Sequence, residues 1–202
     1  MSKYAVLGNP VSHSKSPLIH SLFAKQTNQE MSYTAIPLEE GNFDGFVKSF
    51  FAEGGAGLNV TVPFKENAFA LAASCSPRAQ LAKAVNTLFL DDQGNICGDN
   101  TDGIGLVTDI KQNNGVDLSG QRLLILGAGG AVRGALAALV YEQVATITVV
   151  NRTLAKAKTL ADEFESMTEI EALSYEALQD SANHGRRFDL IINGTSSSLQ
   201  GE

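Results

Sequence analysis

The residues with the most specific chemistry lie in a glycine-rich turn in the second half of the chain. An apolar segment at residues 123–126 runs directly into five small residues, and an Ala/Leu-rich segment follows; the five are Gly127, Ala128, Gly129, Gly130 and Ala131. Glycines allow a tight turn and let the backbone approach a pyrophosphate, while the helix N-terminus supplies N–H donors. The strand–turn–helix context predicts a dinucleotide site, with an unliganded tight turn as the alternative.

One position departs from the usual glycine spacing. The third glycine of the common pattern would fall on Val132. That glycine normally allows close packing between helix and strand. We expect the small residues Ala131, Gly134 and Ala135 to provide this packing instead.

A polar segment after the next apolar stretch indicates which dinucleotide binds. Residues 146–150 are apolar or β-branched, and Asn151, Arg152, Thr153 and Lys156 follow. An NAD site usually places Asp or Glu here, to accept hydrogen bonds from the ribose. Asn151 would not repel a 2′-phosphate, and Arg152 offers it a bidentate guanidinium. The pattern predicts NADP; a Thr153 N-cap beside a solvated Arg152 is a compatible alternative.

Four polar clusters occur in the first 103 residues, each at or near the end of an expected strand. They comprise residues 8–17, 58–65, 84–87 and 98–103. Ligands of open α/β sheets bind at the carboxyl ends of strands. The clusters supply hydroxyls, amides, an ammonium and carboxylates, a mixture that suits a small polyhydroxylated acid.

These four clusters, followed by Gly-Ala-Gly-Gly-Ala and Asn-Arg-Thr, resemble the shikimate dehydrogenase family from Tyr4 to the last residues. The resemblance implies NADP as cofactor and shikimate or 3-dehydroshikimate as substrate, within aromatic amino-acid biosynthesis. By this resemblance Ser14 and Ser16 hold the substrate carboxylate. The substrate hydroxyls are held by Asn59, Thr61, Asn86 and Asp102. Lys65 and Asp102 form the catalytic pair, and Thr195 lines the cofactor side.

The residue types agree with parts of that transfer. Ser16 precedes Pro17 and is expected to be a helix N-cap, which places N–H donors near a bound carboxylate. Lys65 follows Pro63 at an expected strand–helix junction, and its ammonium can give a proton to a developing alkoxide. A carboxylate beside Lys65 would favour the charged lysine, so Asp102 would orient a proton donor. Alternatively, Ser16 only caps a helix, Lys65 is an exposed lysine, and Asp102 is a first-turn acid.

Strands and helices alternate along the chain, which predicts an α/β protein. We expect a substrate-binding and catalytic α/β domain at 1–113. A Rossmann-like, doubly wound NADP-binding domain follows at 114–202, after a polar, turn-rich stretch at 113–120. Expected strands of the first domain include 4–7, 32–36 and 57–62, and expected helices include 42–52 and one after Ser16 that carries Leu18, Ile19, Leu22 and Phe23 on one face.

The expected second domain has too few strands for a complete doubly wound fold, which usually has six. At about 30 residues per βαβ unit, something like ~60 residues would be absent. The alternative to an active dehydrogenase is then a truncated, catalytically weak fragment that binds NADP or a partner. Within the enzyme class, the alternative is a quinate/shikimate dehydrogenase of broader substrate range.

Composition and charge argue against several other classes of protein. The net charge is −7 and no large Lys/Arg cluster occurs, which argues against nucleic acid as a partner. The sequence holds no apolar run long enough for a membrane span and no signal peptide, so a cytoplasmic location is expected. Cys75 and Cys97 lack metal-ligand spacing, and no metal is expected. Oligomeric state cannot be read from these features.

Overall fold

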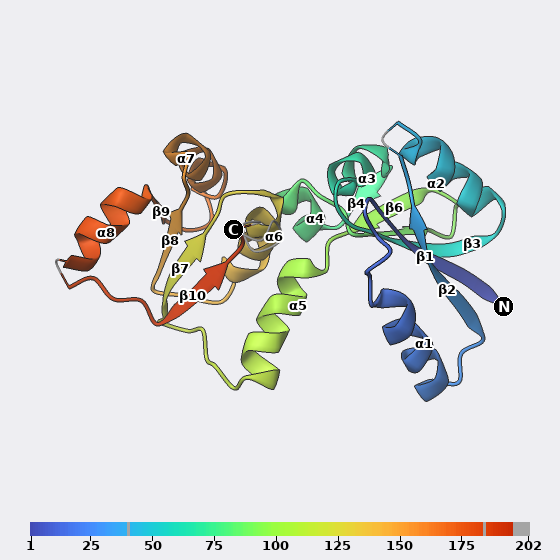
Figure 1. Cartoon of the computed structure of the whole chain (residues 1–202), viewed down its shortest axis with the longest axis horizontal. Coiled ribbons are helices and arrows are strands. Elements are labelled where there is room, and N and C mark those ends of the chain that lie inside the picture. The colour runs from blue at the N-terminus through green and yellow to red at the C-terminus, as the bar shows by residue number, and fades with distance from the viewer. Residues whose placement is uncertain (40, 184, 196–202) are drawn as a thin grey trace. The chain divides into compact units, whose positions relative to one another are not determined.

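The computed structural model describes residues 1–39, 41–183 and 185–195. The chain divides into two compact units, Met1–Thr101 and Asp102–Glu202 (Figure 1). Each contains one sheet, and helices alternate with strands along the chain. The α/β class expected from the sequence is confirmed. The predicted division of roles at residue 113 remains a prediction.

The first unit is built on a six-stranded sheet. Its strands, in the order β2-β1-β3-β5-β6-β4, are β2 (Met31–Pro37), β1 (Ser2–Gly8), β3 (Gly55–Val60), β5 (Thr87–Leu90), β6 (Ile96–Asp99) and β4 (Ser74–Cys75). β1 is parallel to β2 and β3, whereas β5 is antiparallel to β3 and β6. The predicted hairpin turn joins β5 to β6, where the Asp91 carboxylate accepts from the amides of Gln93 and Asn95.

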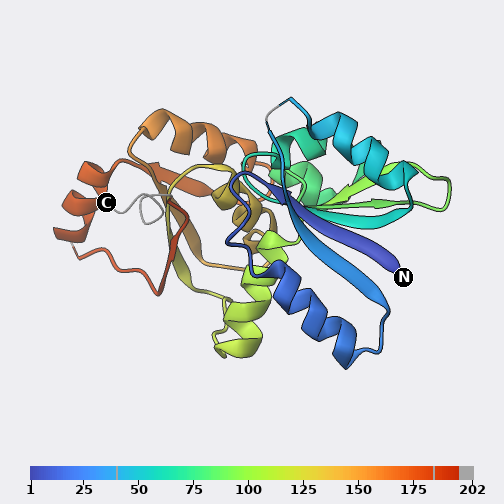
Figure 2. The ribbon, with the colours of Figure 1, turned by 45° about the vertical axis from the view of Figure 1, so that its right-hand side comes forward.

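Helices cover the two faces of this sheet unequally. α2 (Phe43–Ala52) and α3 (Lys65–Leu71) lie on one face, and α1 (Ser16–Gln26) lies on the other (Figures 1 and 2). The short α4 (Pro77–Ala82) precedes β5. The core of the unit forms under α2 and α3, where Phe43, Val47 and Phe51 pack on Leu7 and Leu58. Their spacing matches the helical periodicity of the sequence.

The apolar side chains of α1 are not buried. Leu18, Ile19, Leu22 and Phe23 are between 44% and 60% exposed, and Ala24 is the buried residue of this helix. The helix itself was expected, but its apolar positions are not core positions within the described residues. Periodicity finds an apolar face without showing what covers it.

The second unit is built on a four-stranded parallel sheet. Its order is β10-β7-β8-β9, with β10 (Leu190–Asn193), β7 (Arg122–Leu126), β8 (Thr146–Val150) and β9 (Ile170–Leu173). Its helices are α5 (Asp102–Thr108), α6 (Gly130–Leu139), α7 (Leu154–Glu163) and α8 (Tyr175–Asn183), and the π-helical turn η1 (Asp109–Asn113) extends α5. The chain leaves β9 at one edge and returns beside β7 as β10, the crossover of a Rossmann-like sheet. Sequence periodicity did not predict α8.

Candidate functional site

The loop after β1 and the loop after β3 lie side by side at one end of the first sheet. The Asn9 amide donates to the Val62 carbonyl at 2.9 Å, and the Thr61 amide donates to the Leu7 carbonyl at 2.9 Å. A Cβ on Gly8 would lie 2.5 Å from Cγ2 of Thr61, so a glycine is needed for this approach. The clusters at 8–17 and 58–65 therefore meet, as the strand-end argument predicted.

Ser14 and Ser16 stand at the N-terminus of α1, where the capping role predicted for Ser16 is not observed. Ser16 is the first helical residue and Lys15 is the N-cap, without a side-chain capping bond. The Ser14 hydroxyl instead accepts from the Ser16 amide at 3.2 Å. The prediction that Ser16 caps the helix is therefore wrong, because the helix begins one residue earlier than Pro17 suggested. The helix N-terminus still places its positive dipole end beside both hydroxyls.

Two asparagines join three of the four clusters through hydrogen bonds. Asn59 Nδ2 donates to the Asn86 carbonyl and to Thr87 Oγ1, each at 3.2 Å. Asn86 is 8% exposed, and its Oδ1 accepts from the Thr101 amide at 3.1 Å. The Tyr33 hydroxyl donates to Asn59 Oδ1 at 2.6 Å. Burial raises the pKa of Tyr33 to about 12, and a hydrogen bond with Ser16 partly opposes that rise.

Lys65 is positioned by the backbone beside Asn86. It opens α3 immediately after Phe64, which is 2% exposed and anchors the start of the helix in the core. The Lys65 carbonyl accepts from the Val85 amide at 2.9 Å, and Val85 directly precedes Asn86. The first unit thus brings Lys65, Asn86 and Asn59 to the same end of its sheet. The strand–helix junction expected for Lys65 is confirmed.

Asp102 opens α5 and belongs to the second unit. It is exposed and lies in the first turn of the helix, where a carboxylate is favoured by the helix dipole. Its pairing with Lys65 stays a prediction.

An ion pair at the end of β6 holds the segment that leads to Asp102. The Asp99 carboxylate accepts from Arg78, from the Ser76 hydroxyl and from the Asn100 amide. Burial opposes ionisation of Asp99, but the hydrogen bonds from Arg78 and Ser76 outweigh it and lower the pKa below its usual value. Sequence reasoning missed Arg78 and Tyr33 and gave no role to Asp99, a member of the cluster at 98–103. Arginine and tyrosine are common residues, and only the tertiary structure shows that Arg78 and Tyr33 contact the clusters.

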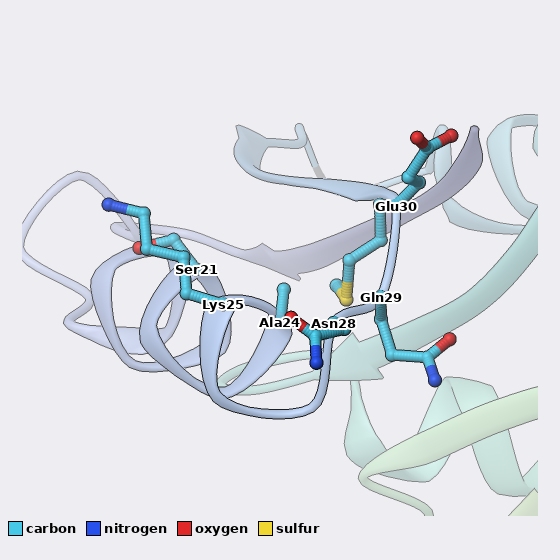
Figure 3. A pocket seen from close by; sticks show the side chains of 7 residues that line it. Ser21, Ala24, Lys25, Asn28, Gln29 and Glu30 are labelled. Carbon is cyan, nitrogen blue, oxygen red and sulfur yellow. The ribbon is translucent and has the colours of Figure 1, made fainter.

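Hollows in the described part of the first unit include two that can be compared with the predicted site residues. One, of about 560 Å³, lies between the end of α1 and the start of β2, and Ser21, Lys25, Asn28 and Glu30 surround it (Figure 3). It contains none of the predicted site residues. The other, of about 430 Å³, is lined by the clusters' own residues Asn59 and Thr87 together with Tyr33, His20 and Phe89. Proximity to the polar network makes the second hollow the relevant one.

The glycine turn of the second unit has the geometry that a pyrophosphate requires. Gly127 has a φ of +104°, a conformation that L side chains rarely adopt. A Cβ on Gly129 or Gly130 would meet nothing within 4 Å, so the space beside the turn is open. α6 begins at Gly130 and directs its first amides toward this space. These residues fit the pyrophosphate of a dinucleotide.

Val132 stands where the usual pattern has its third glycine, and Gly194 makes room for the Val132 side chain. Val132 is 1% exposed, and a Cβ on Gly194 would lie 2.4 Å from its Cγ2. Gly194, after β10, therefore supplies the space that a third glycine would have supplied. The expected substitute Gly134 instead faces α5, where its carbonyl oxygen lies 2.1 Å from the position of a Cβ on Gly103. Gly134 thus lies where α6 approaches α5, and the packing expected of Ala131, Gly134 and Ala135 against the strand stays a prediction.

Thr195 lies next to the glycine turn. A Cβ on Gly127 would be 3.0 Å from the Gly194 carbonyl oxygen and 3.3 Å from the Thr195 amide nitrogen. The Thr195 hydroxyl donates to Asn193 Oδ1 at 2.7 Å. This position beside the turn is compatible with the predicted contact on the cofactor side.

The residues expected at a 2′-phosphate follow β8. The Gly127 amide donates to the Val150 carbonyl at 2.8 Å, which places Asn151 beside the glycine turn. Asn151 Nδ2 donates to the Thr153 carbonyl at 2.9 Å, and Thr153 is the N-cap of α7 without a side-chain capping bond. Arg152 and Lys156 are exposed, and neither forms an ion pair with a carboxylate of residues 1–39, 41–183 or 185–195. The segment presents unneutralised positive charge and no carboxylate of its own.

Neither a membrane-spanning helix nor a metal-binding cluster is found among the described residues. None of the helices there is long and apolar enough to cross a membrane. No group of three or more His, Cys, Asp or Glu side chains in this part of the chain could hold a metal ion.

Comparison with known proteins decides the family. Residues 6–88 match the shikimate dehydrogenase substrate binding domain, and residues 109–200 match shikimate / quinate 5-dehydrogenase. The shikimate dehydrogenase (NADP(+)) of Aeromonas salmonicida (strain A449) is 55% identical over 202 residues, which cover 100% of this chain and 71% of that protein. The chain belongs to the shikimate dehydrogenase family.

Solved structures of similar proteins agree with this placement. An Ael1 enzyme from Pseudomonas putida is 46% identical, with a TM-score of 0.91, and the match covers 100% of this chain and 72% of that one. Shikimate 5-dehydrogenase from Thermus thermophilus, solved with NADP(H) and shikimate, is 34% identical with a TM-score of 0.83 over 97% of this chain and 69% of that one. The shikimate dehydrogenase fold is thus present in both units.

Proposed function

We propose that this chain catalyses the reversible, NADPH-dependent reduction of 3-dehydroshikimate to shikimate. Its relatives are NADP-dependent shikimate dehydrogenases, and the family places it among the oxidoreductases of aromatic amino-acid biosynthesis. The observation that carries the proposal is the polar network of the first unit. Three separate clusters meet there through Asn59 and Asn86, beside the start of α3 at Lys65.

Substrate binding is assigned to the first unit and to the start of α5. Ser14 and Ser16 hold the carboxylate at the N-terminus of α1, where helix amides and hydroxyls favour an anion. The substrate's hydroxyls are held by Asn59, Thr61, Asn86 and Asp102. Amide and hydroxyl side chains suit this task because each can donate and accept hydrogen bonds.

Cofactor binding is assigned to the second unit. Gly127, Ala128, Gly129, Gly130 and Ala131 hold the pyrophosphate, and Thr195 contacts the cofactor next to them. Asn151, Arg152, Thr153 and Lys156 hold the 2′-phosphate. Support comes from the open space beside Gly129 and Gly130 and from the exposed cations after β8.

Proton donation is assigned to Lys65, and the orientation of the Lys65 ammonium is assigned to Asp102. Bound NADPH supplies a hydride to the substrate carbonyl carbon. As charge develops on the carbonyl oxygen, the Lys65 ammonium donates a proton to it and stabilises the negative charge. Asp102 holds the ammonium in place and accepts a hydrogen bond from a substrate hydroxyl. In the direction of oxidation, the neutral Lys65 takes the proton back.

The proposal extends to partner and location. A small-molecule substrate is supported by solved relatives that contain shikimate. A cytoplasmic location is part of the proposal and rests on membership of a biosynthetic enzyme family. The chain spans 71% of the length of the first relatives that it matches. None of the comparisons favours the alternative of a weak binding fragment.

NADPH oxidation by 3-dehydroshikimate tests the proposal. The absorbance of NADPH should fall in the presence of this chain and 3-dehydroshikimate, and it should fall much more slowly with 3-dehydroquinate. Equal rates with both compounds would reassign the chain to broader quinate/shikimate activity. No oxidation with either compound, in a sample shown to be folded, would reject the proposal.

A further inference from the structure

Tyr33 reaches across β1 from the edge strand β2 to the proposed substrate site. It lies on β2 and Asn59 lies on β3, on opposite sides of β1. Tyr33 pairs with Tyr4 and Asn59 pairs with Val6 in the sheet register. The Tyr33 ring stacks on His20 with centroids 4.2 Å apart, and its hydroxyl reaches Asn59 Oδ1 at 2.6 Å. A helix residue and a strand residue thus fix this ring.

The orientation of the Asn59 side chain follows from its partners. A backbone carbonyl can only accept hydrogen bonds, so the amide atom that faces the Asn86 carbonyl must be Nδ2. The opposite atom, which faces Tyr33, is then Oδ1. Because Oδ1 only accepts, the Tyr33 hydroxyl must be the donor. The Asn86 carbonyl excludes the flipped amide, and the Tyr33 hydroxyl, as the donor, holds Oδ1 in place.

This orientation limits what Asn59 can offer to a ligand. Nδ2 donates to both the Asn86 carbonyl and Thr87 Oγ1, so its two hydrogens are engaged. Oδ1 keeps a second lone pair beyond the one that Tyr33 occupies. Asn59 is half-buried and lines a hollow of about 430 Å³, where a ligand can reach it. Toward a ligand, Asn59 is an acceptor.

An acceptor selects a group that can donate. The oxygen that is reduced is a ketone in 3-dehydroshikimate, and a ketone cannot donate a hydrogen bond. An acceptor would therefore bind that oxygen when it is the hydroxyl of shikimate and repel it when it is the ketone of 3-dehydroshikimate. A hydroxyl that is unchanged by the reaction suits Asn59 in both directions.

We propose that Tyr33 is a positioning residue that holds Asn59 as an acceptor for a substrate hydroxyl which does not react. The inference rests on the proposed function and adds a residue that the family resemblance did not assign. Tyr33 acts through Asn59 and does not itself contact the reacting atoms.

Tyr4 provides a matched control. It faces Tyr33 in the register of β1 and β2, and its ring lines the same hollow. Its hydroxyl forms no hydrogen bond with any residue of the described ranges 1–39, 41–183 and 185–195. Tyr4→Phe therefore removes a hydroxyl from the same place without touching Asn59.

The experiment compares Tyr33→Phe and Tyr4→Phe in the full 202-residue chain by calorimetric titration with shikimate and with NADP. Loss of the hydrogen bond to Asn59 should weaken shikimate binding about tenfold in Tyr33→Phe. Tyr4→Phe should bind shikimate as the unaltered chain does, and NADP affinity should be the same in all three. Equal shikimate affinity for the two variants would overturn the proposal.

A double-mutant cycle separates positioning from general stabilisation. If Tyr33 acts through Asn59, Tyr33→Phe should not weaken shikimate binding further once Asn59→Ala is present. An undiminished effect in that background would overturn the proposal.

A second readout is independent of the substrate. Tyr33→Phe should shift the Asn59 side-chain amide resonances and speed their hydrogen exchange, and Tyr4→Phe should not. Unchanged Asn59 resonances would overturn the role of Tyr33 even if the unaltered chain failed to bind shikimate. That failure of binding would count instead against the proposed function.

Discussion

At the residue scale, the family resemblance named the site residues, whereas the contacts that orient their side chains were not predicted from the sequence. The sequence predicted Asn59, Asn86 and Lys65 as site residues, and the first unit places all three at one end of its sheet. Tyr33 and Arg78 were not predicted because their partners, Asn59 and Asp99, lie 26 and 21 residues away in the chain. Such contacts follow from the tertiary structure, which local patterns do not specify.

Lys65 is the residue whose chemical role is tested most simply. Lys65→Met keeps the length of the side chain but removes the proton and the positive charge. We expect kcat to fall about 100- to 10,000-fold, the usual contribution of a general acid, with little change in KM. Steady-state kinetics with shikimate measures both. The exposed Lys48→Met on α2 is the control, and a Lys65→Met enzyme as fast as this control would refute the assignment.

Arg152 should decide between the two nicotinamide cofactors. Arg152→Gln should weaken NADP binding about 10- to 100-fold, as expected when a charge-assisted hydrogen bond is lost, and leave NAD binding unchanged. Lys158→Gln removes a positive charge from the exposed face of α7 and should alter neither affinity. Fluorescence titration with both cofactors makes the measurement. A parallel loss for NAD and NADP would show that Arg152 does not contact the 2′-phosphate.

The Asp99–Arg78 ion pair should make the free energy of unfolding depend on pH in the acid range. The folded-state pKa of Asp99 is lowered, so the pair contributes fully above the unfolded value of about 3.9 and is lost as pH falls through the folded pKa. Asp99→Asn should therefore reduce the loss of stability below about pH 4. Urea unfolding across acid pH measures it, with Asp92→Asn on the exposed hairpin turn as control. Identical pH profiles for the two variants would contradict the prediction.

At the element scale, helix positions were predicted well and helix contacts less well. The helix after Ser16 was predicted, but its cap is one residue earlier and its apolar side chains are exposed. α6 was also predicted, yet its Gly134 packs on α5 and Gly194 accommodates Val132. Periodicity reports which residues share a face. The partner of that face depends on tertiary packing.

The close approach of α5 and α6 predicts opposite effects on stability for two glycine-to-alanine changes on α5. Gly103 and Gly105 lie on the same helix, and a Cβ on Gly103 would lie 2.1 Å from the Gly134 carbonyl oxygen, whereas one on Gly105 would meet nothing within 4 Å. Gly103→Ala should destabilise the protein by about 1–3 kcal/mol through overpacking. Gly105→Ala should stabilise it by about 0.5–1 kcal/mol, because alanine is the better helix former.

Thermal or urea unfolding separates the two glycine variants. Because Asp102 opens α5 next to Gly103, the first change should also lower turnover of shikimate. If Gly103→Ala proved as stable as Gly105→Ala, the close helix crossing would be refuted.

At the scale of the whole molecule, fold class and cofactor type followed from the sequence. Alternating elements predicted the α/β class, and the glycine turn with Asn151 and Arg152 predicted NADP, the cofactor of its relatives. The helix α8 was not predicted, because its sequence is polar on average. The location of the boundary between substrate and cofactor roles stays a prediction.

The central claim is that this chain is an NADP-dependent shikimate dehydrogenase. The most direct measurement is the initial rate of NADP reduction by the purified 202-residue chain with saturating shikimate, followed by NADPH absorbance. The account predicts a rate that depends on shikimate and is far lower when NAD replaces NADP. A folded chain that binds NADP but forms no NADPH with shikimate would contradict it.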